Sequence, residues 1–156
     1  MTRWLLPDII TEEDSVTLLK EISFEQDSQF KHPLIRDIVQ RIGEAINVKL
    51  GAEAPGYIRL ENKDVGHKEH NDRGHRYERA SGHMEWCDYG CSILLSEPHL
   101  FTGGNFLYTR DSPKLITASE HYLSAIVHTS DEFHRVKPHK GIRTVLLLFL
   151  PTEHKE

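Results

Sequence analysis

The last apolar run of the chain, Val145 to Leu150, reads VLLLFL and has no polar residue at any position. Alternate side chains of a strand point to opposite faces of its sheet, so this run predicts a central strand that is covered on both faces. A sheet with such a strand needs other secondary structure above and below it. The run therefore limits the chain to folds in which secondary structure is layered around a sheet.

The chain from residue 57 onward is expected to supply the rest of that sheet. It consists of short apolar or alternating segments divided by Gly, Pro and Asp turns, which is typical of β-structure. The expected strands are residues 57–61, 89–96, 105–110, 115–118, 122–128 and 144–150. Residues 62–79 are almost wholly polar and predict a loop or a solvated ribbon. The pattern shows no helix between the strands, which favours an antiparallel sandwich or barrel.

The first 56 residues predict two helices. Thr11 followed by three acidic residues is typical of a helix N-terminus, and a helix is expected over residues 12–22. After Pro33, apolar residues recur at three- and four-residue steps as far as Leu50, which predicts a second amphipathic helix. The fold class is therefore α+β and mainly β, with two N-terminal helices packed on one side. We expect one domain over residues 1–156, with 1–56 as helical support and 57–150 as the β-structure.

Charge and cysteine content narrow the functional classes. A net charge of -5, with Lys and Arg scattered along the chain, does not favour nucleic-acid binding. The short apolar N-terminus fits neither a signal peptide nor a membrane span, so we expect a soluble, cytoplasmic protein without a membrane partner. Cys87 and Cys91 are expected to be reduced thiols. The chain contains eleven histidines, and this enrichment motivates a search for a metal site.

Three side chains form the leading candidate metal site. His83 and Glu85 are two residues apart, so in a strand they would face the same way and could bind one ion. His134 follows after enough chain to bring it back beside them. Two histidines and one carboxylate are the ligands that suit Fe(II) when three coordination positions stay open. Arg143 stands at the head of the last strand, where its planar guanidinium would suit a carboxylate-bearing cosubstrate.

From His83 to Leu150 the sequence resembles the Fe(II)- and 2-oxoglutarate-dependent oxygenases, in particular the prolyl and lysyl hydroxylase branch. The resemblance lies in the order of His83-x-Glu85, Gly103-Gly104, His134 and Arg143. It implies a double-stranded β-helix, or jelly roll, with Fe(II) on His83, Glu85 and His134. It also implies 2-oxoglutarate as the cosubstrate, with its far carboxylate on Arg143, and ascorbate as a further cofactor to test. His128 departs from the pattern, because an aromatic residue is common at its position.

A rival pair is present in the same sequence. His70 and Asp72 also form a His-x-acid motif, and they follow the expected strand 57–61 at a distance that many members of that family show. We prefer His83 and Glu85 because their spacing to the downstream segments is the tighter match. His99, His139 and His154 are expected at the surface, and His67, His70 and His75 in a solvated loop or, unless His70 is a ligand, in a lid over the substrate.

The resemblance implies a hydroxylase that oxidises 2-oxoglutarate to succinate and CO2 with O2. Its substrate would be a C–H bond of a protein side chain or of a small molecule. The alternative is a non-catalytic, cupin-like module that uses the metal to bind a sugar or an organic acid. A structural zinc site is a third hypothesis, but it would require four ligands, and the sequence offers three.

Overall fold

The computed structural model describes residues 2–22, 32–50, 57–73, 75–76, 79–80 and 87–152. The largest sheet has five strands in the order β1-β10-β6-β13-β2, and all of its pairs are antiparallel. Its strands are β1 (Arg3–Leu6), β10 (Ala125–Thr129), β6 (Tyr89–Leu94), β13 (Val145–Leu150) and β2 (Tyr57–Glu61). The expected central strand is confirmed, because β13 lies between β6 and β2.

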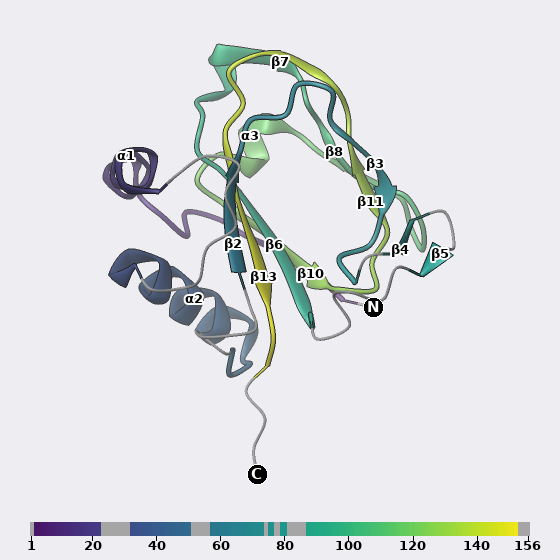
Figure 1. Ribbon diagram of the computed structural model, residues 1–156, viewed down its shortest axis with the longest axis horizontal. Coiled ribbons are helices and arrows are strands. Elements are labelled where there is room, and N and C mark those ends of the chain that lie inside the picture. The colour runs from purple at the N-terminus through teal and green to yellow at the C-terminus, as the bar shows by residue number, and fades with distance from the viewer. Residues whose placement is uncertain are drawn as a thin grey trace.

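A second sheet of four strands faces one side of the first (Figure 1). In the order β3-β11-β8-β9 it contains β3 (His67–His70), β11 (His134–Val136), β8 (Phe106–Tyr108) and β9 (Lys114–Ile116). Two short antiparallel pairs complete the described β-structure: β7 (Phe101–Gly103) with β12 (His139–Gly141), and β4 (His75–Arg76) with β5 (Arg79–Ala80).

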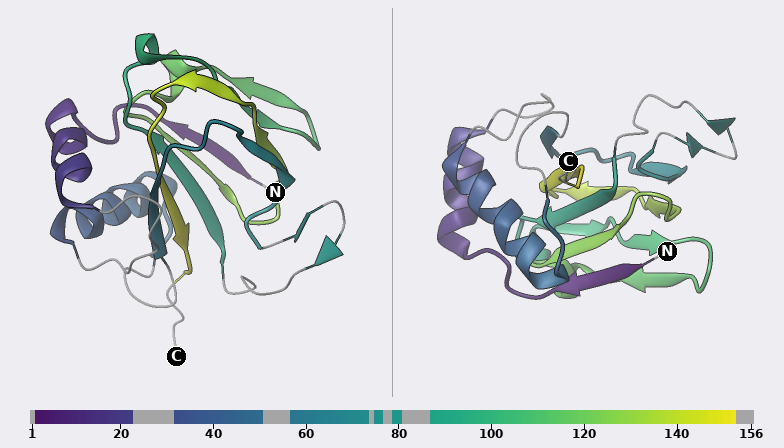
Figure 2. Two further views of the ribbon diagram at one scale, coloured as in Figure 1. Left: turned by 45° about the horizontal axis from the view of Figure 1, so that its top comes forward. Right: turned by 90° about the horizontal axis from the view of Figure 1, so that it is seen from below.

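Two helices lie together on the opposite side of the five-stranded sheet (Figure 2). Helix α1 (Glu12–Glu21) begins at Thr11 with a capping box in which Thr11 and Asp14 satisfy each other's backbone N–H groups. Helix α2 (Pro33–Ile46) has proline in its first turn, where no backbone N–H is needed, and ends at Asn47 in the left-handed conformation. Both expected helices are present.

The main apolar core lies between these helices and the five-stranded sheet. Ile35, Ile38 and Ile42 of α2 are fully buried against Leu146 and Leu148 of β13. Each such side chain contributes about 1.5–3 kcal/mol when it leaves water. The helices are therefore held by the sheet rather than by their own propensity.

Some local expectations were wrong. The polar stretch 62–79, expected to be a loop or a solvated ribbon, contains β3, which pairs with β11 at the edge of the four-stranded sheet although its composition shows no apolar alternation. Strands β4 and β5, the second of which ends at Ala80, pair with each other as a separate two-stranded ribbon. A one-turn helix, α3 (Ala118–His121), begins after Thr117, whose capping box with Glu120 starts a helix between two strands. The expected strand 122–128 begins only at Ala125, because Leu123 has a positive φ of 57°.

Two further elements were not expected. Strand β1 pairs with β10 at the edge of the large sheet, and the 3-10 helix η1 (Pro98–Leu100) precedes β7. Within the described residues, no helix combines the length and the apolar character that crossing a bilayer requires.

Candidate metal centre

Two histidines from different parts of the chain meet across a strand pair. His70 is the last residue of β3, His134 is the first residue of β11, and the two are direct partners in the antiparallel register. Direct partners in such a ladder lie close enough for their side chains to touch. Their ring centroids are 4.5 Å apart.

Both imidazoles are oriented by the same kind of hydrogen bond. Nδ1 of His70 lies 2.7 Å from the carbonyl of Lys68, and Nδ1 of His134 lies 3.0 Å from the carbonyl of Glu132. A carbonyl can only accept, so each ring donates from Nδ1, and in the neutral ring Nε2 then keeps a lone pair. This is the arrangement that prepares a histidine to bind a metal through Nε2.

Asp72 completes the cluster from the turn that follows β3. Its Oδ1 lies 3.4 Å from Nε2 of His134, and its backbone N–H donates to the carbonyl of Ser130 at 3.1 Å. The side chain is 6 % exposed. One ligand atom each from His70, Asp72 and His134 can be chosen so that all lie within 4.8 Å of one another.

Space for the Asp72 carboxylate depends on a glycine in the opposite sheet. A Cβ at Gly90 of β6 would lie 1.6 Å from Oδ2 of Asp72 and 2.8 Å from Nε2 of His128. Heavy atoms do not approach so closely without a bond, so a side chain at residue 90 would displace the carboxylate. The glycine lets the turn after β3 reach the inner face of the five-stranded sheet.

The electrostatics of the cluster suit a cation. Burial alone would raise the pKa of Asp72, but His134 and His128 hold it well below its usual value, so the carboxylate is ionised. Burial lowers the pKa of His70 to about 4, with a contribution from His134. Burial would also lower the pKa of His134, but the Asp72 carboxylate outweighs it and the pKa is raised.

The donor set fits Fe(II). Two imidazole nitrogens and one carboxylate on one side of an ion leave the opposite octahedral positions open, which is the arrangement of non-haem iron oxygenases. A structural zinc site would close four ligands around the ion, and within the described residues this cluster contains three.

The structure therefore brings His134 together with the rival pair, His70 and Asp72. The preferred pair, His83 and Glu85, lies in residues 81–86, outside the described residues.

Arg143 lies two residues before β13 and is 5 % exposed. Its Cδ lies 2.6 Å from the point where a Cβ at Gly104 would be, so the arginine occupies the space that this glycine leaves. Gly104 is two residues from Phe106, whose ring stacks on His134 with centroids 5.1 Å apart. Two residues span at most about 7 Å of chain, so Arg143 and His134 contact positions that lie close together in the segment 104–106.

Polar groups surround this arginine. Oδ1 of Asn62 accepts from the backbone N–H of Arg143 at 3.3 Å and from Nε2 of His139 at 3.0 Å. Nearby, His121 is fully buried, and burial together with the charge of Arg143 lowers its pKa to about 3. The expectation that His139 lies at the surface was wrong: it is 5 % exposed, because β12 pairs with β7 and turns it inward.

Two further residues of the site, His128 and Tyr108, had no role predicted from the sequence. Nε2 of His128 lies 2.6 Å from Oδ2 of Asp72, and Nδ1 of the same ring lies 3.0 Å from the hydroxyl of Tyr108. His128 is on β10 and contacts Asp72 directly, whereas Tyr108 on β8 is linked to Asp72 only through His128. The histidine at position 128, where the resembling family commonly has an aromatic residue, was the sequence feature that could have indicated this role.

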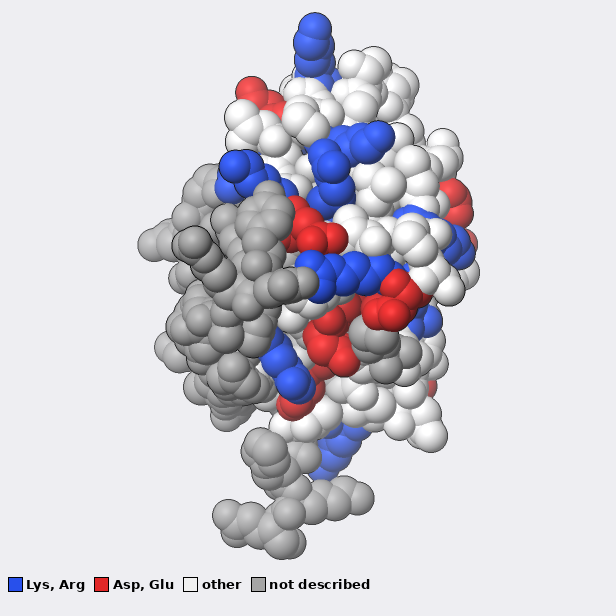
Figure 3. All heavy atoms as spheres, turned by 90° about the vertical axis from the view of Figure 1, so that its right-hand side faces the viewer, with Lys and Arg blue, Asp and Glu red and all other residues white. Residues whose placement is uncertain are grey.

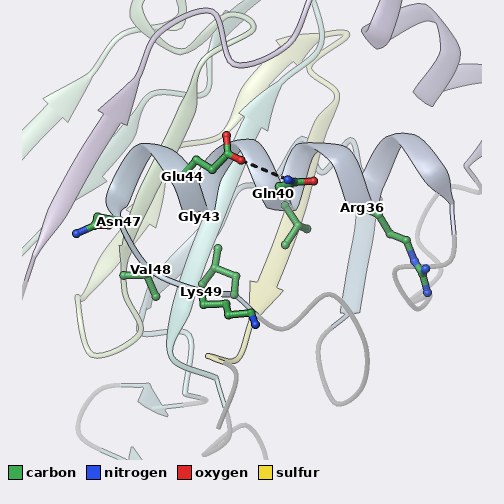
Figure 4. A pocket seen from close by; sticks show the side chains of 9 residues that line it. Arg36, Gln40, Gly43, Glu44, Asn47, Val48 and Lys49 are labelled. Carbon is green, nitrogen blue, oxygen red and sulfur yellow. Dashed lines mark hydrogen bonds between the residues drawn. The ribbon is translucent and has the colours of Figure 1, made fainter. Parts of the chain in front are cut away.

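Other surfaces differ from this interior. On the face that carries β3 and β11, basic side chains lie among acidic ones (Figure 3), and one such contact joins Arg110 to Glu69 at 2.9 Å. A hollow of about 580 Å³ lies beside α2, where Gln40 and Glu44 are hydrogen-bonded (Figure 4). None of the metal-cluster residues lines it.

No family model matches the sequence, and no curated protein matches it. Solved structures do match, and they are members of the 2OG-Fe(II) oxygenase family, including prolyl-4-hydroxylases. An oxidoreductase of that family from Burkholderia pseudomallei has a TM-score of 0.65 at 15% identity, over 96% of this chain and 84% of that chain. A Pseudomonas putida prolyl-4-hydroxylase has a TM-score of 0.62 at 12% identity, over 97% and 93%.

A third match is HygX from Streptomyces hygroscopicus, solved with nickel and 2-oxoglutarate bound. Its TM-score is 0.61 at 12% identity, over 96% of this chain and 81% of that chain. At these identities the likeness concerns the fold. The protein has the fold of 2-oxoglutarate-dependent oxygenases, and a His-Asp-His cluster lies inside it.

Proposed function

We propose that the protein is an Fe(II)- and 2-oxoglutarate-dependent dioxygenase that hydroxylates a C–H bond, with a double-stranded β-helix as its scaffold. The observation that carries the proposal is the cluster of half-buried His70 with buried Asp72 and His134, with both imidazoles oriented through Nδ1. The substrate would be either a protein side chain, such as that of a prolyl or lysyl residue, or a small molecule.

The three side chains would hold the iron and leave three positions open. When bound, Fe(II) would supply the redox chemistry by which O2 oxidises 2-oxoglutarate to succinate and CO2 and places one oxygen atom in the substrate. The protein contributes geometry and charge. Asp72, ionised at neutral pH, offsets one positive charge of the ion, and the two histidines donate neutral lone pairs.

Arg143 would bind the far carboxylate of 2-oxoglutarate. A guanidinium offers a planar pair of N–H donors that matches a carboxylate, and burial strengthens the attraction. Its place beside Gly104, two residues from the Phe106 ring that stacks on His134, supports this role. Asn62 and His139, held together at 3.0 Å, lie beside the backbone of Arg143 and would be neighbours of the bound carboxylate.

Assignment of the first two ligands to His70 and Asp72 is part of the proposal. This assignment is supported by the contacts of both residues with His134: Asp72 lies 3.4 Å from it, and His70 is its strand partner. His83 and Glu85 are the competing assignment. The variants Asp72→Ala and Glu85→Ala distinguish the two assignments, since only substitution of the residue that binds the metal should abolish metal binding.

The test measures binding and turnover in the full chain under anaerobic and then aerobic conditions. We expect Fe(II) and 2-oxoglutarate together to raise the unfolding midpoint more than either alone, and succinate to form once O2 is admitted. Arg143→Gln should abolish the effect of 2-oxoglutarate but retain that of the metal. Lys140→Gln, an exposed change on the neighbouring strand β12, is the matched control.

Failure of 2-oxoglutarate to bind in the presence of metal would contradict the proposal. Binding of both, without succinate over a panel of peptide and small-molecule substrates, would instead support the cupin-like binding module.

A further inference from the structure

His128 occupies a position that the metal cluster itself does not explain. Strand β10 alternates between the two sides of its sheet: Ala125 and Val127 pack in the helix-side core, whereas Ile126 packs with Phe106 and Tyr108 inside. His128 follows this alternation to the inner side and is 2 % exposed. A polar ring buried there needs hydrogen-bonding partners.

Its partners form a chain with a defined direction. The Asp72 carboxylate is ionised and can only accept, so Nε2 of His128 carries the proton of their 2.6 Å hydrogen bond. In the neutral ring, Nδ1 is then an acceptor, and it receives the Tyr108 hydroxyl at 3.0 Å. The order is therefore Tyr108 to His128 to Asp72, with each donor matched to one acceptor.

Neighbouring rings hold this histidine in place. Phe106 stacks on it with centroids 6.0 Å apart, and Tyr108 meets it edge-on at 5.5 Å. Tyr108 is itself covered by the guanidinium of Arg3, 4.1 Å from its centroid. Gly90 leaves the space in which the imidazole and the carboxylate meet.

The two oxygens of Asp72 consequently face different groups. Oδ2 accepts from His128, whereas Oδ1 faces Nε2 of His134 at 3.4 Å. A carboxylate whose second oxygen is held in a short hydrogen bond is disfavoured as a two-oxygen chelate, since chelation would require that oxygen to turn towards the ion.

We propose that His128 is a positioning residue that makes Asp72 a one-oxygen metal ligand, with Tyr108 fixing the tautomer of the imidazole. The proposal rests on the metal site of the proposed function. The number of oxygens that Asp72 supplies decides how many of the six coordination positions of the ion stay open. A one-oxygen carboxylate leaves three positions for cosubstrate and O2, and a chelating carboxylate would leave two.

The experiment titrates Co(II) into the full chain and records affinity and visible absorption, which reports the coordination geometry, without 2-oxoglutarate. His128→Gln retains an N–H donor near the place of Nε2, whereas His128→Phe retains the ring and removes the donor. We expect His128→Phe to weaken Co(II) binding about 10–100-fold, the usual cost of losing a hydrogen-bond partner behind a metal ligand, and to change the spectrum. His128→Gln should restore most of the affinity and the spectrum.

Tyr108→Phe should cause a smaller loss than His128→Phe, because the donor to Asp72 remains. The matched control is His121→Gln, which changes another buried histidine whose Nε2 bonds to the carbonyl of Ser92, and it should leave Co(II) affinity unchanged. Thermal unfolding of each apo variant checks that it folds, and a variant that does not is replaced by His128→Leu.

Three outcomes would overturn the proposal. Equal large losses of Co(II) affinity in His128→Gln and His128→Phe would indicate that His128 is itself a metal ligand. Unchanged Co(II) affinity in both variants would show that His128 has no role in metal binding. Equal losses in His128→Phe and His121→Gln would indicate a general packing effect. If the unaltered chain binds no Co(II), the proposed function fails, whereas normal binding with insensitive His128 variants refutes this inference alone.

Discussion

The two faces of the five-stranded sheet have opposite compositions although the same strands form both. Towards the helices, β10 and β6 present Ala125, Val127, Cys91 and Ile93 in one apolar core. Towards the second sheet, the same two strands present His128 and the open position at Gly90, where Asp72 enters. One residue of shift along either strand would exchange the two sets.

The helix-side face of the sheet mainly stabilises the fold, whereas the inner face carries the residues of the metal site. Burial of apolar area on the helix side does not depend on a bound ion, whereas the inner face collects buried polar groups that are costly unless they are paired. Substitutions on the helix side should therefore change unfolding more than binding, and substitutions on the inner face should do the reverse.

The largest effect is expected from Asp72→Asn on the inner face. Loss of a charged ligand should reduce Co(II) affinity on the order of 1000-fold, about 4 kcal/mol, because the amide supplies no negative charge to the ion. Isothermal titration of the full chain measures this loss. Asn has nearly the shape of Asp and keeps an oxygen that can accept from His128, so the apo variant should still fold, with a lower unfolding midpoint because the charge that faces His128 and His134 is lost. An apo variant that does not fold would contradict the separation of the two faces.

The reverse test is Leu146→Ala on the helix side of β13. Leu146 is fully buried, so the substitution should destabilise the protein by about 2–5 kcal/mol through lost burial and a cavity. Urea unfolding measures the change. Co(II) affinity at a temperature where the variant is folded should stay within about twofold, and a large loss of metal binding would show that the faces are coupled.

Gly90→Ala adds one methyl group to the inner face. That carbon would fall on the Asp72 carboxylate, so we expect the side chain to shift and Co(II) affinity to fall about 10–100-fold, as when a ligand loses its support. Ser92→Ala, two residues along the same strand, removes an atom instead of adding one and is the control. Equal affinities for the two variants would contradict the proposed place of Asp72.

The smallest expected effect is on the pH dependence of the free energy of unfolding in mild acid. His121 is buried with a pKa of about 3, while an unfolded histidine titrates near 6.5, so below pH 6.5 the unfolded state binds a proton that the native state does not. This contribution to stability is complete above that pH and falls by about 1.4 kcal/mol per pH unit below it. Urea unfolding of the apo protein from pH 7 to 5 should show a shallower slope for His121→Gln; an unchanged slope would contradict it.

Much of the architecture follows from local signals. Thr11 with Asp14 and Pro33 after His32 predicted where the helices begin, and the VLLLFL run predicted the central strand. These signals are readable because capping and apolar periodicity depend on residues close together in the chain. The order of His134 and Arg143 before the last strand was predicted in the same way, from spacing and from the resemblance to a known family.

Local patterns along the chain were thus enough to predict the helices, the central strand and the kinds of side chain that a metal site could use. The contacts of the site arise only on folding: His70 faces His134, Asp72 reaches over Gly90, and His128 donates to Asp72. Each of these contacts joins segments that are far apart in the chain. Pairing register and glycine-sized spaces between sheets leave no local pattern, so only the folded arrangement of both sheets defines them.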